Sequence, residues 1–132
     1  MNTVRLQADS ISFRYRETAP FIFENISFEI KEGEVLALLG RNGVGKSTLL
    51  NCLMGFLSVH TGSVKCNGRD IRNLSMKERA TEVAFVPQII GSEITYTVRD
   101  YISFGATART GMFSAPSKAE FEEVDTIIDT LG

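Results

Sequence analysis

The residues with the clearest chemical potential lie in one stretch at positions 40–48, with the sequence Gly-Arg-Asn-Gly-Val-Gly-Lys-Ser-Thr. Four of them occupy the fixed places of the phosphate-binding pattern G-x-x-x-x-G-K-[S/T]: Gly40, Gly45, Lys46 and Ser47. A short apolar run rich in strand formers precedes this stretch, and an apolar pattern with helical spacing follows it. The pattern therefore stands in the strand–loop–helix context that it requires, and we call residues 40–48 the phosphate loop.

The residue types in the phosphate loop suit a chain of phosphate groups. Gly43 and Gly45 let the backbone turn where a Cβ would clash, so that several N–H groups can point into one concavity. The helix that follows offers free N–H groups and a dipole that favours an anion. Lys46 can reach the β- and γ-phosphates, the Ser47 hydroxyl can serve as a Mg²⁺ ligand, and Thr48 is expected to stabilise the first helical turn. The alternative is a glycine-rich turn with an accidental Lys-Ser pair, which the flanking pattern disfavours.

Composition narrows the class of protein. The 132 residues are 43% hydrophobic and 23% charged, which fits one globular domain of ordinary size. A net charge of −2 and scattered basic residues give no reason to expect nucleic acid as a partner. The sequence has no signal-peptide pattern and no apolar run near the ~18 residues that span a bilayer. We therefore expect a cytoplasmic protein that reaches a membrane only through a partner.

The remaining reactive side chains give weaker signals. Cys52 and Cys66 are far apart and lack a metal-binding spacing, so buried thiols without a disulfide are expected. His60 is the only histidine and lies in a turn-like segment, where a solvated side chain is a commoner outcome than a catalytic one. Asp125 and Asp129 lie on an amphipathic helical pattern and are interpreted as solvated carboxylates.

The hydrophobic pattern predicts a β-rich beginning. Residues 4–15 alternate with a slip near Asp9-Ser10, which predicts either two strands or one bulged strand. Residues 26–30 alternate again, and residues 63–68 are typical of a strand that ends in an Asn-Gly turn. Two apolar runs are expected to be buried strands: residues 35–39 and 83–86.

Helical patterns dominate the later sequence. A helix is expected from about Lys46 to about Gly55 or Phe56. Further helices are expected to begin after Ser75, Thr97 and Ser117, and the first and third of these open an S-x-x-E capping pattern.

Two side chains outside the phosphate loop are candidates for the same site. Tyr15 ends an early strand pattern, where an aromatic ring could stack on a base or could simply be a half-buried strand tyrosine. Gln88 follows residues 83–87 and could touch Mg²⁺ or orient a water, or could be an ordinary loop glutamine. Spacing alone favours a half-buried strand tyrosine at position 15 and an ordinary loop glutamine at position 88.

Several short segments match one family in both order and spacing. They are Phe13-Arg14-Tyr15, the phosphate loop, Thr61-Gly62-Ser63-Val64, Asn67-Gly68-Arg69-Asp70-Ile71, Val86-Pro87-Gln88 and Thr97-Val98-Arg99-Asp100. On these segments the chain resembles the N-terminal part of an ATP-binding-cassette (ABC) ATPase. A narrower resemblance, over residues 97–118, is to the ATPases of importers for iron-siderophore, haem or cobalamin.

The resemblance implies an α/β fold with a partial P-loop NTPase core. Residues 1–34 and 61–72 would form mainly an antiparallel β subdomain. Residues 35–60 and 73–88 would belong to the P-loop core, and residues 89–132 would begin a helical subdomain.

The resemblance also implies a role for each site residue. ATP would be bound by Tyr15 and by the phosphate-loop residues Gly40, Asn42, Gly43, Gly45, Lys46, Ser47 and Thr48. Mg²⁺ would be held by Ser47 and Gln88, and the residues that support hydrolysis would be Lys46 and Gln88. The expected partners are a polytopic transmembrane permease and a second ATPase subunit, with the protein peripheral on the cytoplasmic face of the cell membrane.

Several elements of the family pattern are absent from the 132 residues. The signature loop, a second acidic motif, the catalytic glutamate and the switch histidine all follow the glutamine in the family, and none occurs here. The chain by itself is therefore expected to bind nucleotide without turnover. A P-loop protein outside transport, such as a kinase or an ABC ATPase acting on nucleic acid or ribosomes, is the alternative class.

Overall fold

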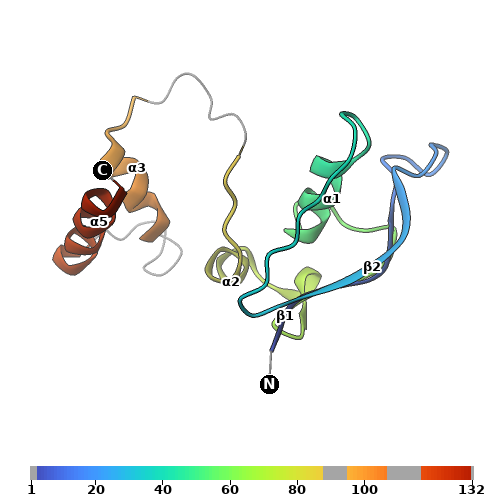
Figure 1. The fold of residues 1–132 in the computed structure, drawn as a ribbon, viewed down its shortest axis with the longest axis horizontal. Helices are drawn as coiled ribbons and strands as arrows, with labels where there is room; N and C mark the ends of the chain where they lie inside the picture. Colours follow the sequence, from blue (N-terminus) through green and yellow to red (C-terminus); the bar gives the residue numbers. More distant parts are fainter. Residues whose placement is uncertain (1–2, 88–94, 107–116, 132) are drawn as a thin grey trace. The chain divides into compact units, whose positions relative to one another are not determined.

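The computed structural model describes residues 3–87, 95–106 and 117–131. By its internal contacts the chain forms two compact units, Met1–Ser75 and Met76–Gly132. Figure 1 shows the sheet and first helix of the first unit and the helices of the second. Each unit is described by itself, and the finer division into subdomains stays a prediction.

An antiparallel sheet organises the first unit, with the strand order β2-β1-β3-β4. The strands are β1 Val4–Phe13, β2 Phe23–Lys31, β3 Thr61–Cys66 and β4 Arg69–Asp70. Helix α1, Lys46–Leu53, follows the phosphate loop, and a short 3-10 helix, η1, covers Ile71–Asn73. The expected antiparallel β region at the beginning of the chain is confirmed. Helix α1 ends two to three residues earlier than expected, just before Gly55, which has a φ of 73°.

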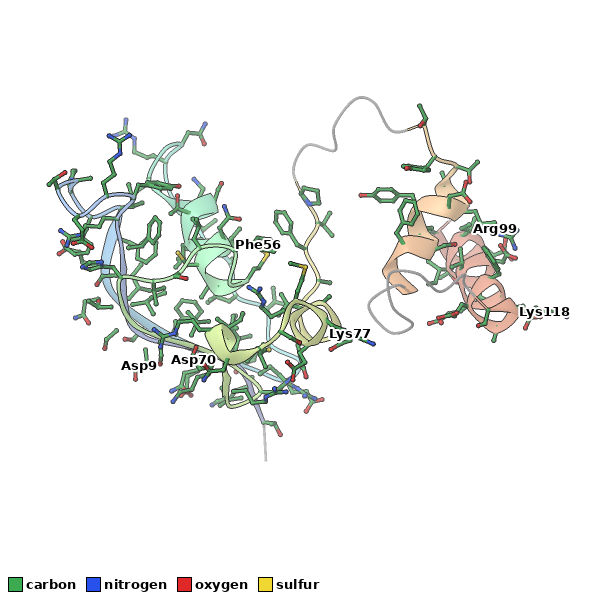
Figure 2. All side chains as sticks on the ribbon, turned by 180° about the vertical axis from the view of Figure 1, so that it is seen from behind. Asp9, Phe56, Asp70, Lys77, Arg99 and Lys118 are labelled. Carbon is green, nitrogen blue, oxygen red and sulfur yellow. The ribbon has the colours of Figure 1, made fainter. Side chains whose placement is uncertain are left out.

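The slip in the alternation of β1 corresponds to a bulge in a single strand. Pairing with β2 shifts between Ala8 and Ile11, and pairing with β3 shifts between Asp9 and Ser12. Ser10 takes a φ of 49° inside the bulge, and its neighbour Asp9 is labelled in Figure 2. Gly62 on β3 faces this bulge with a φ of 80°, and a Cβ there would lie 2.3 Å from the carbonyl oxygen of Asp9. Only glycine therefore lets β3 approach the bulge.

The Asn-Gly turn is confirmed as a two-residue hairpin between β3 and β4. Asn67 and Gly68 have φ values of 47° and 77°, and Cys66 pairs with Arg69 across the turn. Two consecutive positive φ angles match the right-handed twist of the flanking strands.

Asp70, at the end of β4, accepts two hydrogen bonds from the Arg72 guanidinium and one from the backbone N–H of Arg72. These hydrogen bonds hold the pKa of the Asp70 carboxyl below its usual range.

The core of the first unit is drawn from β1, β3, α1 and η1. Its side chains with the least exposed surface are Ile11, Val64 and Cys52. Cys52 and Cys66 are both buried, and each is a thiol rather than half of a disulfide, as the sequence predicts. Burial raises the pKa of the Cys52 thiol to about 11, so this thiol stays protonated and neutral at neutral pH.

The prediction of buried strands at residues 35–39 and 83–86 is wrong for this structure. Neither segment has strand pairing, and Val35, Leu39 and Val86 are 96%, 89% and 89% exposed. An apolar run becomes a buried strand only when neighbours hydrogen-bond to it and cover both faces. Among the described residues, the strands that pair are those of the antiparallel sheet, and they offer neither segment a partner.

The second unit is helical. Its elements are α2 Met76–Glu82, α3 Val98–Ser103, the 3-10 helix η2 Phe104–Ala106 and α5 Lys118–Leu131. These three α-helices begin where the sequence predicts. Helix α2 follows Ser75, and α3 begins with a capping box formed by Thr97 and Asp100. At the start of α5, the side chains of Ser117 and Glu120 each accept a hydrogen bond from the other's backbone N–H.

Helices α3 and α5 contact each other, and one basic residue of α3 bonds to α5. The Arg99 guanidinium, labelled in Figure 2, donates to the Asp125 carboxylate at 2.6 Å and lies over the Phe121 ring at 4.9 Å. Asp125 is thus a half-exposed ion-pair partner rather than only a solvated carboxylate. Throughout the described ranges, every helix is too short or too polar to cross a lipid bilayer.

Candidate functional site

The phosphate loop ends in a glycine whose conformation begins α1. Gly45 is the N-cap of α1 with φ 102° and ψ 10°, in the left-handed region. The backbone N–H of Leu49 donates to the Gly45 carbonyl at 2.8 Å, so the helix starts directly from the loop. The N–H groups of the first helical turn have no acceptor within a helix and remain available to an anion.

A second constraint on Gly45 comes from the connection between β1 and β2. A Cβ at position 45 would lie 2.5 Å from Cγ2 of Ile22. Ile22 is itself fixed, because its backbone N–H donates to the Phe13 carbonyl at 2.8 Å. We call residues 14–22 the aromatic turn, and its last residue therefore lies against the end of the phosphate loop.

Lys46 folds back over the phosphate loop. Its ammonium donates to the carbonyl oxygens of Gly40 and Arg41, both at 2.8 Å. These two bonds close the loop around the positive charge. An ammonium has three donors, so one remains for an anion that enters the loop.

The other loop residues differ in their exposure. Asn42 and Ser47 are exposed, whereas Thr48 is 9% exposed. The exposed Ser47 hydroxyl at the first turn of α1 fits a Mg²⁺–phosphate group, because hydroxyl and phosphate oxygens are ligands that Mg²⁺ accepts. Gly40 and Gly43 complete the loop backbone around Lys46.

Tyr15 lies just beyond the end of β1, within the aromatic turn. Its side chain is 62% exposed, and its ring meets the Phe13 ring edge-on at 5.0 Å between centroids. Its hydroxyl lies 3.1 Å from the Thr48 hydroxyl. The structure thus brings Tyr15 to the phosphate loop with much of its ring exposed, and its contact with a base stays a prediction.

The predicted site residue Gln88 lies outside the described residues. Its roles toward Mg²⁺ and water therefore stay predictions.

A cluster that the sequence reasoning missed holds the aromatic turn. The Arg14 guanidinium donates to Nε2 of His60 at 3.0 Å, also donates to the Glu17 carboxylate, and lies 4.8 Å from the centre of the Phe21 ring. Phe21 in turn meets the His60 ring edge-on at 5.6 Å. His60 is therefore an exposed residue, as expected, whose ring also contacts the aromatic turn. No local pattern reveals this cluster, because Arg14 and His60 are 46 positions apart.

Comparison with known proteins places the chain in a family. Residues 23–132 match the family model described as ABC transporter. The chain belongs to the ABC transporter family. This match covers most of the sequence and confirms the resemblance to ABC ATPases, which bind ATP, generally together with Mg²⁺.

Two relatives illustrate the match. A Helicobacter pylori protein named "Probable iron chelatin transport ATP-binding protein" is 28% identical over 127 residues, which cover 96% of this chain and 49% of the relative. A Methanocaldococcus jannaschii protein named as an uncharacterized ABC transporter ATP-binding protein is 42% identical over 88 residues, covering 67% of this chain and 34% of the relative. The chain thus spans about half, or less, of the length of these relatives.

A solved structure agrees with the sequence relatives. An ABC transporter of the metal-chelate type, in an inward-facing conformation, matches with a TM-score of 0.77 and 27% identity. The match covers 98% of this chain and 45% of the other. It confirms the expected fold class, an α/β P-loop NTPase domain that begins with an antiparallel β region.

Proposed function

We propose that the chain is the ATP-binding subunit of an ABC transporter and that it holds Mg-ATP at the phosphate loop. The observation that carries this proposal is the closed loop itself. Lys46 spans two loop carbonyls at 2.8 Å, and the left-handed Gly45 feeds directly into α1. The loop thus offers an anion the free N–H groups of a helix N-terminus and one ammonium, which are groups that stabilise a triphosphate tail.

Each predicted residue has a place in this proposal. Lys46 neutralises the β- and γ-phosphates, while Gly40, Asn42, Gly43 and Gly45 supply backbone around them. Ser47 and Gln88 hold Mg²⁺, which neutralises charge on the phosphate oxygens when it is bound. Thr48 supports the first turn of α1, and Tyr15 offers its exposed ring to adenine.

Turnover requires more than these residues. Phosphoryl transfer depends on positioning the attacking water and on neutralising charge from several sides. The 132 residues contain Lys46 and Gln88 but none of the later family motifs. We propose that this chain alone binds nucleotide without hydrolysis, and that hydrolysis belongs to a complete domain paired with a second copy.

The transported substrate is proposed from the relatives. The Helicobacter pylori relative is named for iron chelatin transport, and the solved structure is of the metal-chelate type. We propose import of an iron-siderophore, haem or a similar metal chelate through a transmembrane permease, with the protein peripheral on the cytoplasmic face of the membrane.

Co-purification tests the transport proposal. We expect the protein, tagged in its native host, to co-purify with a polytopic membrane protein after mild detergent extraction. The control is the same purification with an unrelated tagged cytoplasmic protein. Recovery with nucleic acid or ribosomes and without a membrane protein would contradict transport and support an ABC ATPase outside transport.

A further inference from the structure

The aromatic turn contacts the phosphate loop and the first turn of α1 at two points. At its end, Ile22 lies against Gly45 so closely that a Cβ there would be 2.5 Å from Cγ2 of Ile22. Near its beginning, the Tyr15 hydroxyl lies 3.1 Å from the Thr48 hydroxyl. The two contacts fall on either side of Lys46 and Ser47, the residues that open α1.

The Tyr15–Thr48 contact is sheltered on the side of Thr48. Thr48 is 9% exposed, whereas the Tyr15 side chain as a whole is 62% exposed. Tyr15 is therefore an exposed residue whose hydroxyl lies against the first turn of α1. A hydrogen bond sheltered from water contributes more to local rigidity than one on an open surface.

The aromatic turn is held in place by several contacts of its own. Arg14 is held by Glu17, His60 and Phe21, and Tyr15 is held edge-on against Phe13 at 5.0 Å. The far end of the turn is tied to β1 by the hydrogen bond from Ile22 to Phe13 at 2.8 Å. The turn thus joins the first turn of α1 to the end of β1.

We propose that the Tyr15 hydroxyl is a positioning group for phosphate, which acts through Thr48 on the first turn of α1. This role is separate from any contact of the Tyr15 ring with a base. Fixing Thr48 fixes the N–H groups of Lys46, Ser47 and Thr48 before a phosphate arrives, so less ordering is required on binding. The inference rests on the proposed function, because it assumes that the phosphate loop binds oligophosphates.

The test compares Mg-ATP with Mg-tripolyphosphate, which lacks the base. Tyr15→Phe keeps the ring and removes the hydroxyl. Loss of one neutral hydrogen bond is expected to weaken binding of both ligands by the same factor, roughly three- to tenfold. In a Thr48→Val background the same substitution is expected to change neither affinity further, because the partner hydroxyl is already gone.

A matched control separates positioning from general destabilisation. Ser27 accepts a hydrogen bond from the Ser10 backbone N–H at 2.8 Å on the sheet, so Ser27→Ala also removes one hydroxyl contact from the first unit. We expect Ser27→Ala to lower thermal stability about as much as Tyr15→Phe and to leave both affinities unchanged. Amide hydrogen exchange at Leu49, whose N–H donates to the Gly45 carbonyl at the start of α1, should accelerate only in Tyr15→Phe.

Three outcomes would overturn the inference. In the first, Tyr15→Phe weakens ATP alone, which would assign the hydroxyl to the base. In the second, both ligands bind Tyr15→Phe as tightly as they bind the wild type, while Lys46→Ala still weakens binding. The proposed function would then survive without the inference. In the third, the wild type binds neither ligand, and the proposed function fails together with the inference.

Discussion

Lys46→Ala is expected to raise the Kd for Mg-ATP by roughly 100-fold. A charge-assisted hydrogen bond contributes about 1.5–3 kcal/mol, and every ~1.4 kcal/mol is a factor of ten in affinity. Lys46 also closes the loop through the carbonyls of Gly40 and Arg41, so its removal loosens the backbone that surrounds the phosphates. Isothermal titration calorimetry of both proteins with Mg-ATP measures the change directly.

A second lysine provides the matched control for this result. Lys31 is an exposed residue at the end of β2, so Lys31→Ala removes the same charge away from the phosphate loop. We expect it to bind Mg-ATP like the wild type. Equal affinity of the Lys46→Ala and Lys31→Ala proteins for Mg-ATP would contradict the assignment of the phosphate loop as the ATP site.

The same pair of proteins tests turnover. Phosphate release by the wild-type chain is expected to stay at background, because the chain contains only part of the groups that hydrolysis needs. Steady release that Lys46→Ala abolishes would show that 132 residues suffice for catalysis, and the proposal of binding without turnover would then be withdrawn.

Gly45→Ala is expected to destabilise the first unit by about 2–5 kcal/mol and to weaken Mg-ATP binding. Two costs add together. A non-glycine residue in the left-handed region costs roughly 1–2 kcal/mol, and forcing an extra carbon against Ile22 costs about 1–3 kcal/mol. The φ of 102° and the 2.5 Å approach to Cγ2 of Ile22 identify both costs at this one position. Urea unfolding, followed by far-UV circular dichroism, measures the sum.

Two further variants separate these costs. Gly33 has a φ of 77° with no atom within 4 Å of a built Cβ, so Gly33→Ala reports the backbone cost alone. In Gly45→Ala/Ile22→Ala the clash is removed while the backbone cost remains, and we expect part of the stability to return. If the effects of Gly45→Ala and Ile22→Ala on the free energy of unfolding simply add in the double variant, Ile22 does not constrain position 45.

Features that depend on short stretches of sequence were predictable. The slip at Asp9-Ser10 marks the position of the bulge because a single break in alternation is a local event, although the alternation also allowed two separate strands. Asn67-Gly68 signals the hairpin, and Ser75, Thr97 and Ser117 mark helix starts, since in each case neighbouring residues determine the backbone. The phosphate loop belongs to the same class, because its glycines, lysine and serine lie within nine positions.

Features that depend on distant partners were not predictable. Residues 35–39 have the composition of a buried strand, but composition cannot supply the neighbouring strands that would pair with them. The need for glycine at position 62 comes from the Asp9 carbonyl on another strand, which the sequence of β3 does not reveal. The hydrogen bond between Tyr15 and Thr48 joins residues 33 positions apart, so it became visible only in the folded chain.

The most direct test of the account is a titration of the ¹⁵N-labelled protein with Mg-ATP, followed by amide NMR. Saturable binding of one nucleotide per chain is predicted, with the largest shifts at the amides of Gly43, Gly45, Lys46 and Ser47. The Lys46→Ala protein should lose these shifts while retaining the spectrum of a folded chain. Saturable binding that leaves the phosphate-loop amides unmoved, or no saturation in the millimolar range, would contradict the assignment of this loop as the ATP site.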